Sequence, residues 1–321
     1  MTTAPAQPGA TVTPIKPKAV VRVGDRVFSA ASVIAGGLIL FVLVLVAAFL
    51  VWQSIPAFSA KVGELPGKAT NFWDFVGPLV FGTVWSALIA LVIAVPLSLG
   101  IALFISHFAP RRLAPVLGYV IDLLAAVPSV VYGLWGIAVL APLVKPFYVF
   151  LNEYVGWFPL FSGQVSGTGR TILTASIVLA VMAIPIMTAV MREIFLQAPT
   201  LNEEAALALG ATRWEMIRMA VLPFARSGIV SGAMLGLGRA LGETMAVAMV
   251  LAPSSLVTFQ LLSTVNPSTI PATIALRFPE AHGDGTATLV AAGLILFVVT
   301  FAVNFLARWI VARRAEFSGA N

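Results

Sequence analysis

Two charged residues stand one helical turn apart in an otherwise apolar stretch of this sequence. The segment GRALGETMAV, residues 238–247, holds Arg239 and Glu243. A charge in the middle of a bilayer costs about 3 kcal/mol on insertion scales, and such residues usually face a cavity or a partner. The planar arginine fork matches the oxygens of a phosphate-like anion. We therefore expect either an anion path, in which Glu243 neutralises Arg239 until an oxyanion replaces it, or a permanent ion pair that locks two helices together.

Small residues repeat along the same predicted helix. Every fourth residue is a glycine on one stripe, and two more glycines continue the spacing on an adjacent stripe. Small residues at this spacing let a second helix approach closely. The predicted close-packing residues are Gly228, Gly232, Gly236, Gly238 and Gly242.

The composition is that of a membrane protein. Of the 321 residues, 60% are hydrophobic and 10% charged, and the mean hydropathy is +1.00. Soluble domains are nearer 45–50% apolar and about 25% charged. The absence of cysteine excludes disulfides and thiolate metal sites. His107 and His282 have no metal-ligand spacing, so we expect no metal site and no catalytic residues.

Six apolar runs are long enough to span a bilayer. They cover residues 31–52, 79–105, 117–143, 172–191, 222–251 and 289–311. Residues 1–28 read as a disordered basic cytoplasmic tail, residues 29–78 as the first transmembrane helix with an external loop, residues 79–314 as the core, and residues 315–321 as a C-terminal tail. Of 19 Lys and Arg residues, thirteen fall in segments that are cytoplasmic if the N-terminus is inside, five fall outside and one is Arg239. The positive-inside rule then predicts an all-α, multi-pass membrane protein with both termini in the cytoplasm.

A polar segment joins the fourth and fifth spans. In residues 192–223, strong helix formers follow Pro199 and Thr200, which predict a turn and a cap. Gly210 would end this helix, and Thr212 would cap a second one. An interfacial amphipathic helix is the alternative, but Glu203 and Glu204 disfavour an anionic lipid surface.

This segment resembles the EAA loop of bacterial ATP-binding-cassette (ABC) importer permeases. The loop at about residues 199–222 reads Glu-Ala-Ala, three residues, Gly, nine residues and then Ala-Val-Leu-Pro, with alanine at 220 where the family usually has isoleucine. The resemblance implies a type I importer permease whose coupling helix enters a groove of a cytoplasmic ATPase. The residues that it assigns to coupling are Glu203, Glu204, Ala205, Ala206, Gly210, Leu222 and Pro223.

Further motifs resemble the permeases of the phosphate ABC importer, and more closely the PstC-type subunit. They are GRALGETMAV, VPSVVYGLWG at residues 127–136, IPIMTAVMREIF and the external segment that begins GWFPLFSGQVSGTGRT. The resemblance implies a phosphate path lined by Arg239 and Glu243. Pro128 and Gly133 would break helix regularity near a cavity, so Ser129 and Tyr132 could donate hydrogen bonds to an oxyanion, with packing as the alternative for Tyr132.

The family resemblance also implies the partners. They are a PstA-type second permease, a PstB-type ATPase dimer that uses ATP and Mg, a PstS-type external phosphate-binding protein and the lipid of the bacterial inner membrane. The chain itself would be non-catalytic, would bind no cofactor and would have no nucleic acid partner.

Other functions remain open. A permease for molybdate, sulfate or phosphonate would share the EAA loop. A secondary transporter or channel would use the Arg–Glu pair as a relay, but would leave the EAA pattern unexplained. An intramembrane enzyme would need a catalytic set that the predicted spans do not contain.

Overall fold

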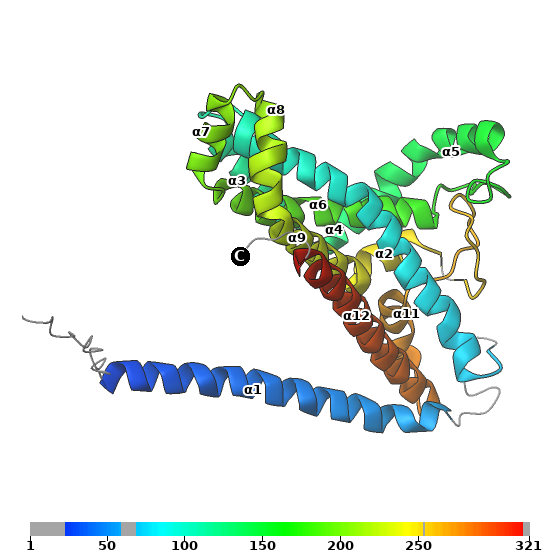
Figure 1. Cartoon of the computed structure of the whole chain (residues 1–321). Coiled ribbons are helices and arrows are strands. Elements are labelled where there is room, and N and C mark those ends of the chain that lie inside the picture. Colours follow the sequence, from blue (N-terminus) through cyan, green and yellow to red (C-terminus); the bar gives the residue numbers. More distant parts are fainter. Residues whose placement is uncertain (1–22, 59–68, 253, 317–321) are drawn as a thin grey trace, which may run out of the picture. The chain divides into compact units, whose positions relative to one another are not determined.

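The computed structural model describes residues 23–58, 69–252 and 254–316 (Figure 1). Most of the predicted tail, residues 1–22, lies outside the described residues, as do 59–68 in the first external loop and 317–321 in the C-terminal tail. The chain divides into two units, Met1–Phe49 and Leu50–Asn321. Each unit is described by itself.

The first unit consists, in its described part, of helix α1 (Val23–Ser54), which continues into the second unit. The helix begins before residue 28, so the predicted tail is too long by one and a half turns. Almost all of its apolar side chains from Val27 to Phe49 are exposed. A helix that is apolar on every side is suited to a lipid environment.

The second unit is built around three long helices. These are α2 (Phe72–Leu103), α6 (Ile172–Leu196) and α9 (Leu222–Gly242), and each packs against the other two. Asn71 and Thr171 cap α2 and α6 by accepting backbone N–H groups. The main core lies between these helices, and α6 contributes fully buried Leu179, Met187 and Met191.

The third span is broken where a single helix was predicted. It consists of α3 (Ala114–Ala125), α4 (Ser129–Trp135), a π-helical turn η3 (Gly136–Leu140) and α5 (Ala141–Val155). Pro128 takes an extended conformation (φ −59°, ψ 139°) and becomes the N-cap of α4. A proline also disfavours a helical conformation in the residue before it, here Val127. The helix long enough to span is therefore Ser129–Val155, and α3 is a shorter apolar helix.

The fifth span is also interrupted, and this contradicts the continuous helix predicted for residues 222–251. Helix α9 ends at Gly242, Glu243 is extended, and a short helix α10 (Met245–Val250) follows. At its other end the helix is longer than predicted, because α8 (Arg213–Met216) and a π-helical turn η4 (Ile217–Val221) run without a break into α9. Pro223 cannot donate a backbone hydrogen bond, which accounts for the π-helical turn just before it.

The remaining elements complete the second unit. A 3-10 turn η1 (Ile55–Phe58) ends the first span, a π-helical turn η2 (Phe104–Phe108) ends α2, and α7 (Thr200–Ala208) precedes α8. Helices α11 (Ile270–Arg277) and α12 (Asp284–Glu316) follow, joined by the 3-10 turn η5 (Phe278–Glu280). In the described residues six helices are long and apolar enough to cross a membrane. The all-α architecture with six spans is thus as predicted.

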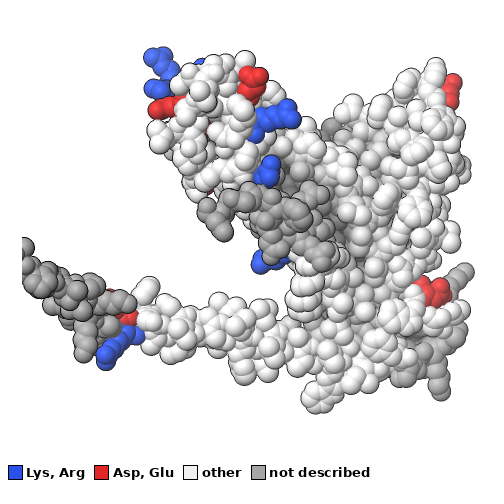
Figure 2. Space-filling view, viewed as in Figure 1, with Lys and Arg blue, Asp and Glu red and all other residues white. Residues whose placement is uncertain are grey.

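Charged side chains in the second unit gather at one end (Figure 2). That end carries α7 and α8, where Glu204, Arg213, Glu215 and Arg218 are exposed (Figure 1). Most of the remaining visible surface of this unit carries no charge. This distribution is expected for helices immersed in lipid with a polar segment outside it.

Candidate functional site

Arg239 lies in the last turn of α9, next to the break in the fifth span. Its side chain is partly buried, and its Nε is buried with no hydrogen-bond partner in the described part of the chain. Buried polar atoms are nearly always paired, so each exception needs an explanation. An unpaired guanidinium N–H beside an unwound segment can donate a hydrogen bond to an oxygen of a ligand.

Glu243 does not share a helical face with Arg239. It has left the helix (φ −68°, ψ 127°), and its Oε1 accepts a hydrogen bond of 3.1 Å from the backbone N–H of Ala246. The predicted Arg239–Glu243 ion pair is not formed. Among the described residues the ion pair found joins His107 and Glu203. Two predictions relied on this pair: that Glu243 neutralises Arg239 until an oxyanion replaces it, and that a permanent ion pair holds two helices together. Both are wrong for this conformation.

Tyr132 and Ser129 lie at the start of α4. The Tyr132 hydroxyl donates a 2.8 Å hydrogen bond to the carbonyl oxygen of Leu124, close to the end of α3. This bond bridges the break at Pro128, which agrees with the packing alternative for Tyr132. Ser129 is partly buried, and its donation to an anion stays a prediction.

The two motifs that suggested an anion path lie against each other. A Cβ atom on Gly133 of α4 would be 2.9 Å from Cα of Ala246 in α10, and one on Gly136 would be 2.9 Å from Cγ2 of Val250. Only glycine allows this close approach. The glycines of VPSVVYGLWG thus hold α4 against the half-helix that follows the break at Glu243.

The glycine stripes of α9 divide into two groups. A Cβ atom on Gly228, Gly232 or Gly236 would press against Ile194, Met191 or Met187 of α6. Gly238 and Gly242 have no atom within 4 Å of that position. The first stripe therefore packs on α6, whereas the second makes no such contact within the described part of this chain.

Arg170 has a role that sequence reasoning missed. Its Nε and Nη2 donate hydrogen bonds of 3.1 Å and 2.9 Å to the carbonyl oxygens of Val250 and Met249 at the end of α10. A cation at a helix C-terminus satisfies otherwise unpaired carbonyls and interacts well with the helix dipole. One signal for this role was present in the sequence: charged residues are rare in this chain, and Arg170 stands two residues before α6.

The segment between α6 and α9 has the predicted helix–turn–helix form. Gly210 takes φ +88° after α7, a conformation that favours glycine. Thr212 and Glu215 form a capping box at the start of α8. Two details differ: the N-cap of α7 is Pro199, without a side-chain hydrogen bond from Thr200, and the second helix is the beginning of the fifth span.

The residues assigned to coupling are distributed over this segment. Glu204 and Ala205 are exposed, while Glu203 and Ala206 are partly buried. Leu222 is partly buried and Pro223 exposed at the start of α9. In the described residues no group of three or more His, Cys, Asp and Glu side chains could hold a metal ion.

Comparison with known proteins identifies the family. Residues 94–316 match the family model of the "Binding-protein-dependent transport system inner membrane component". The chain belongs to this family. The match includes every residue assigned above to the substrate path and to coupling in this permease.

Relatives of the permease carry a consistent name. It is 44% identical over 314 residues to "Phosphate transport system permease protein PstC 2" of Mycobacterium tuberculosis, covering 92% of this chain and 94% of that protein. It is 46% identical over 245 residues to "Phosphate transport system permease protein PstC" of Xylella fastidiosa, covering 75% and 74%. The predicted resemblance to PstC-type permeases is confirmed.

A solved structure shares the fold. A chain of a bacterial ABC transporter involved in the import of the acidic polysaccharide alginate aligns with a TM-score of 0.57 and 17% identity, covering 89% of this chain and 96% of that one. At this identity the likeness is one of fold, and it agrees with an importer permease architecture.

Proposed function

We propose that this permease is the PstC-type subunit of an ATP-driven importer that carries inorganic phosphate across the bacterial cytoplasmic membrane. The observation that carries the proposal is the buried, unpartnered Nε of Arg239 at the break between α9 and α10. The names of the relatives indicate phosphate as the anion.

The residues around the break can bind an anion and release it. An arginine fork offers several donors to phosphate oxygens. Glu243 is engaged with the N–H of Ala246 and forms no ion pair with Arg239. Among the described residues Arg239 therefore has no carboxylate partner, which leaves its charge available to a ligand. Ser129 adds a hydroxyl donor near the start of α4, and no covalent chemistry is required of this chain.

The exposed part of the segment around α7 is suited to docking an ATPase. Leu209 is 90% exposed, and Leu201 and Trp214 are also exposed beside Glu204. A mixed apolar and acidic surface on a helix end favours a protein partner over an anionic membrane. We assign ATP hydrolysis to a separate PstB-type dimer, with a PstA-type permease and a PstS-type external protein as the other partners.

The proposal is tested by uptake of labelled phosphate in cells with and without this subunit. We expect uptake at micromolar phosphate that depends on the subunit and is blocked by excess unlabelled phosphate, but not by sulfate, molybdate or a phosphonate. Uptake that persists without the subunit, or that molybdate blocks as well as phosphate, would reject phosphate as the substrate.

A further inference from the structure

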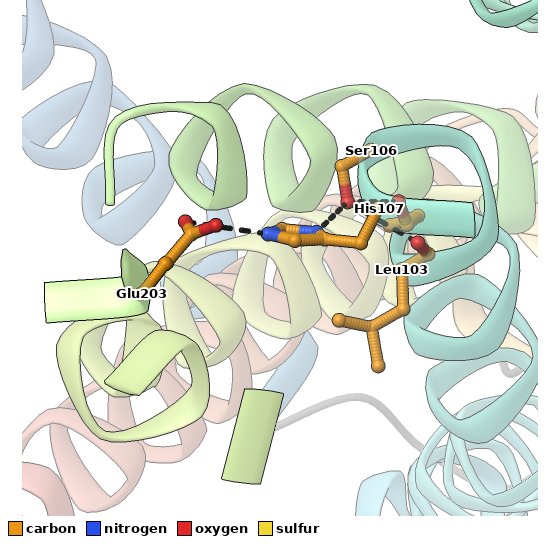
Figure 3. A network of polar contacts seen from close by, with 5 residues as sticks. Leu103, Ser106, His107 and Glu203 are labelled. Carbon is orange, nitrogen blue, oxygen red and sulfur yellow. Dashed lines mark hydrogen bonds and ion pairs between the residues drawn. The ribbon is translucent and has the colours of Figure 1, made fainter. Parts of the chain in front are cut away.

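A polar network joins the end of α2 to the coupling segment (Figure 3). His107, in the turn η2, points its Nδ1 at the Ser106 hydroxyl at 2.7 Å and its Nε2 at Oε1 of Glu203 at 3.6 Å. The two side chains of the ion pair are only 9% and 21% exposed. The imidazole also makes a T-shaped contact with the ring of Phe195 in α6, with 6.5 Å between the ring centroids. His107 is thus enclosed by α2, α6 and α7.

The neighbours of His107 define where its proton lies. The Ser106 hydroxyl is 2.8 Å from the carbonyl oxygen of Ala102 and has one hydrogen to give. If it donates to Ala102, Nδ1 must donate to Ser106; if it donates to Nδ1, the ring proton is on Nε2. A bare Nε2 would point its lone pair at the Glu203 carboxylate. Nε2–H therefore faces Glu203 when Ser106 donates to Nδ1, and also when Nδ1 donates to Ser106 provided that both ring nitrogens carry a proton.

This contact gives α7 a direct connection to α2. Helix α7 packs mainly on α8 and η4, the elements that follow it in the chain. Those elements lead into α9, so α7 is attached to α9 by the backbone and to α2 by the side chains of His107 and Glu203. A displacement of α7 can then act on two span helices.

The N-terminal half of α2 has contacts of its own. Thr83 Oγ1 accepts a 2.9 Å hydrogen bond from the backbone N–H of Ile270. One residue earlier, Gly82 lies directly against the carbonyl oxygen of Ser268. Between Thr83 and His107, the Ser98 hydroxyl donates to the carbonyl oxygen of Ile184 in α6 at 3.3 Å. Packed helices and hydrogen bonds of this kind can carry energetic coupling between distant sites.

We propose that His107 is a positioning residue that ties the coupling helix α7 to α2 and passes the movement of α7 to the segment 268–270, which contacts the N-terminal half of α2 at Gly82 and Thr83. The inference rests on the proposed function, because it takes α7 to be the element that the ATPase moves. The role assigned to His107 is mechanical: it holds Glu203 and touches neither phosphate nor ATP.

The test uses the assembled complex in vesicles and measures phosphate transported for each ATP hydrolysed. The variant His107→Phe keeps a ring against Phe195 but loses the donor, and His107→Gln keeps a donor without the charge. We expect His107→Phe to lower the ratio about 3- to 10-fold, with His107→Gln near wild type. The double variant His107→Phe/Glu203→Ala should be no worse than His107→Phe, because both changes remove one interaction.

A covalent link supplies the second readout. The chain has no cysteine, so His107→Cys/Glu203→Cys can be joined by a short bifunctional thiol reagent. We expect the unlinked pair to behave like His107→Phe and the linked pair to regain the wild-type ratio. An unchanged ratio in His107→Phe, additive losses in the double variant, or a linked complex that does not transport would each overturn the proposal.

The wild-type complex separates this inference from the proposed function. If it hydrolyses ATP without carrying phosphate, the substrate assignment fails. The number of anions transported for each ATP is then measured with the anion that the wild type does carry. If no such anion is found, the readout is the ATP hydrolysis that the external binding protein stimulates. In either case the same variants and outcomes decide the role of His107.

Discussion

Gly82 in α2 provides a sharp test of how this helix is seated. Its position leaves no room for a methyl group, because a Cβ atom would overlap the carbonyl oxygen of Ser268 and lie 2.8 Å from that of Pro267. Backbone atoms cannot rotate away as a side chain can. We predict that Gly82→Ala forces α2 and the segment 267–270 apart and breaks the bond between Thr83 and Ile270.

The magnitude follows from two opposing effects. Overpacking in a close-packed interior costs about 1–3 kcal/mol, and an immovable neighbour places Gly82 at the upper end. The gain in helix propensity from Gly to Ala returns about 1 kcal/mol. The net loss is about 2 kcal/mol, and at about 2–4 °C for each kcal/mol the midpoint of unfolding should fall by about 4–8 °C.

Gly100 in the same helix is the matched control. It has no atom within 4 Å of the Cβ position, so Gly100→Ala should leave the midpoint unchanged or raise it. The assay is thermal unfolding of the purified permease in detergent, with both variants at the same protein concentration. Equal midpoints for Gly82→Ala and Gly100→Ala would refute the close approach of α2 to Ser268.

Three further predictions concern other parts of the second unit. Arg170→Gln should lower phosphate uptake several-fold by releasing the carbonyls of α10, with Arg170→Lys intermediate; equal uptake in both would contradict the clamp. Thr212→Ala should destabilise the start of α8 by about 1 kcal/mol, seen as faster hydrogen exchange of its amides, and an unchanged rate would argue against the capping box. Gly236→Val should impair folding by displacing Met187, whereas Gly238→Val should be tolerated within this chain; measured by yield and midpoint of unfolding, the opposite order would refute the assignment of the two stripes.

The architecture could be predicted from the sequence because it depends on apolar length. The number of spans was predicted correctly, since a run of about 20 apolar residues is hard to accommodate otherwise, but the third and fifth spans have other bounds than predicted. The turn at Gly210 and the cap at Thr212 were also predictable, because their residue types satisfy local backbone requirements. Orientation relative to the membrane rests on charge distribution and stays a prediction.

The breaks in the third and fifth spans could not be located from hydropathy. Pro128 was a local signal, because a proline disfavours a helical conformation in the residue before it. Glu243 gave none, because glycine and glutamate also occur within helices. The break depends on two contacts of α10 with residues far away in the sequence. Arg170 donates hydrogen bonds to the carbonyl oxygens at the end of α10, and Gly133 packs against Ala246.

The chemistry of the site was predicted in part. Arg239 stood out because a charge in an apolar run needs a partner or a ligand, and its unpaired Nε agrees with a ligand. The pairing with Glu243 was inferred from helical spacing, and it failed because the helix ends between them. His107 was considered only as a metal ligand, for which its spacing from His282 is unsuited, and only the fold brings it to Glu203.

The central claim, that Arg239 receives phosphate in the path, is tested most directly by one uptake measurement. Labelled phosphate uptake is compared among wild type, Arg239→Lys and Arg239→Gln, after equal membrane levels and intact assembly have been shown for all three. We predict that Arg239→Gln loses uptake, that Arg239→Lys retains a part of it, and that ATP hydrolysis persists in both. Wild-type uptake by Arg239→Gln would contradict the claim and leave Arg239 with a packing role at the end of α9.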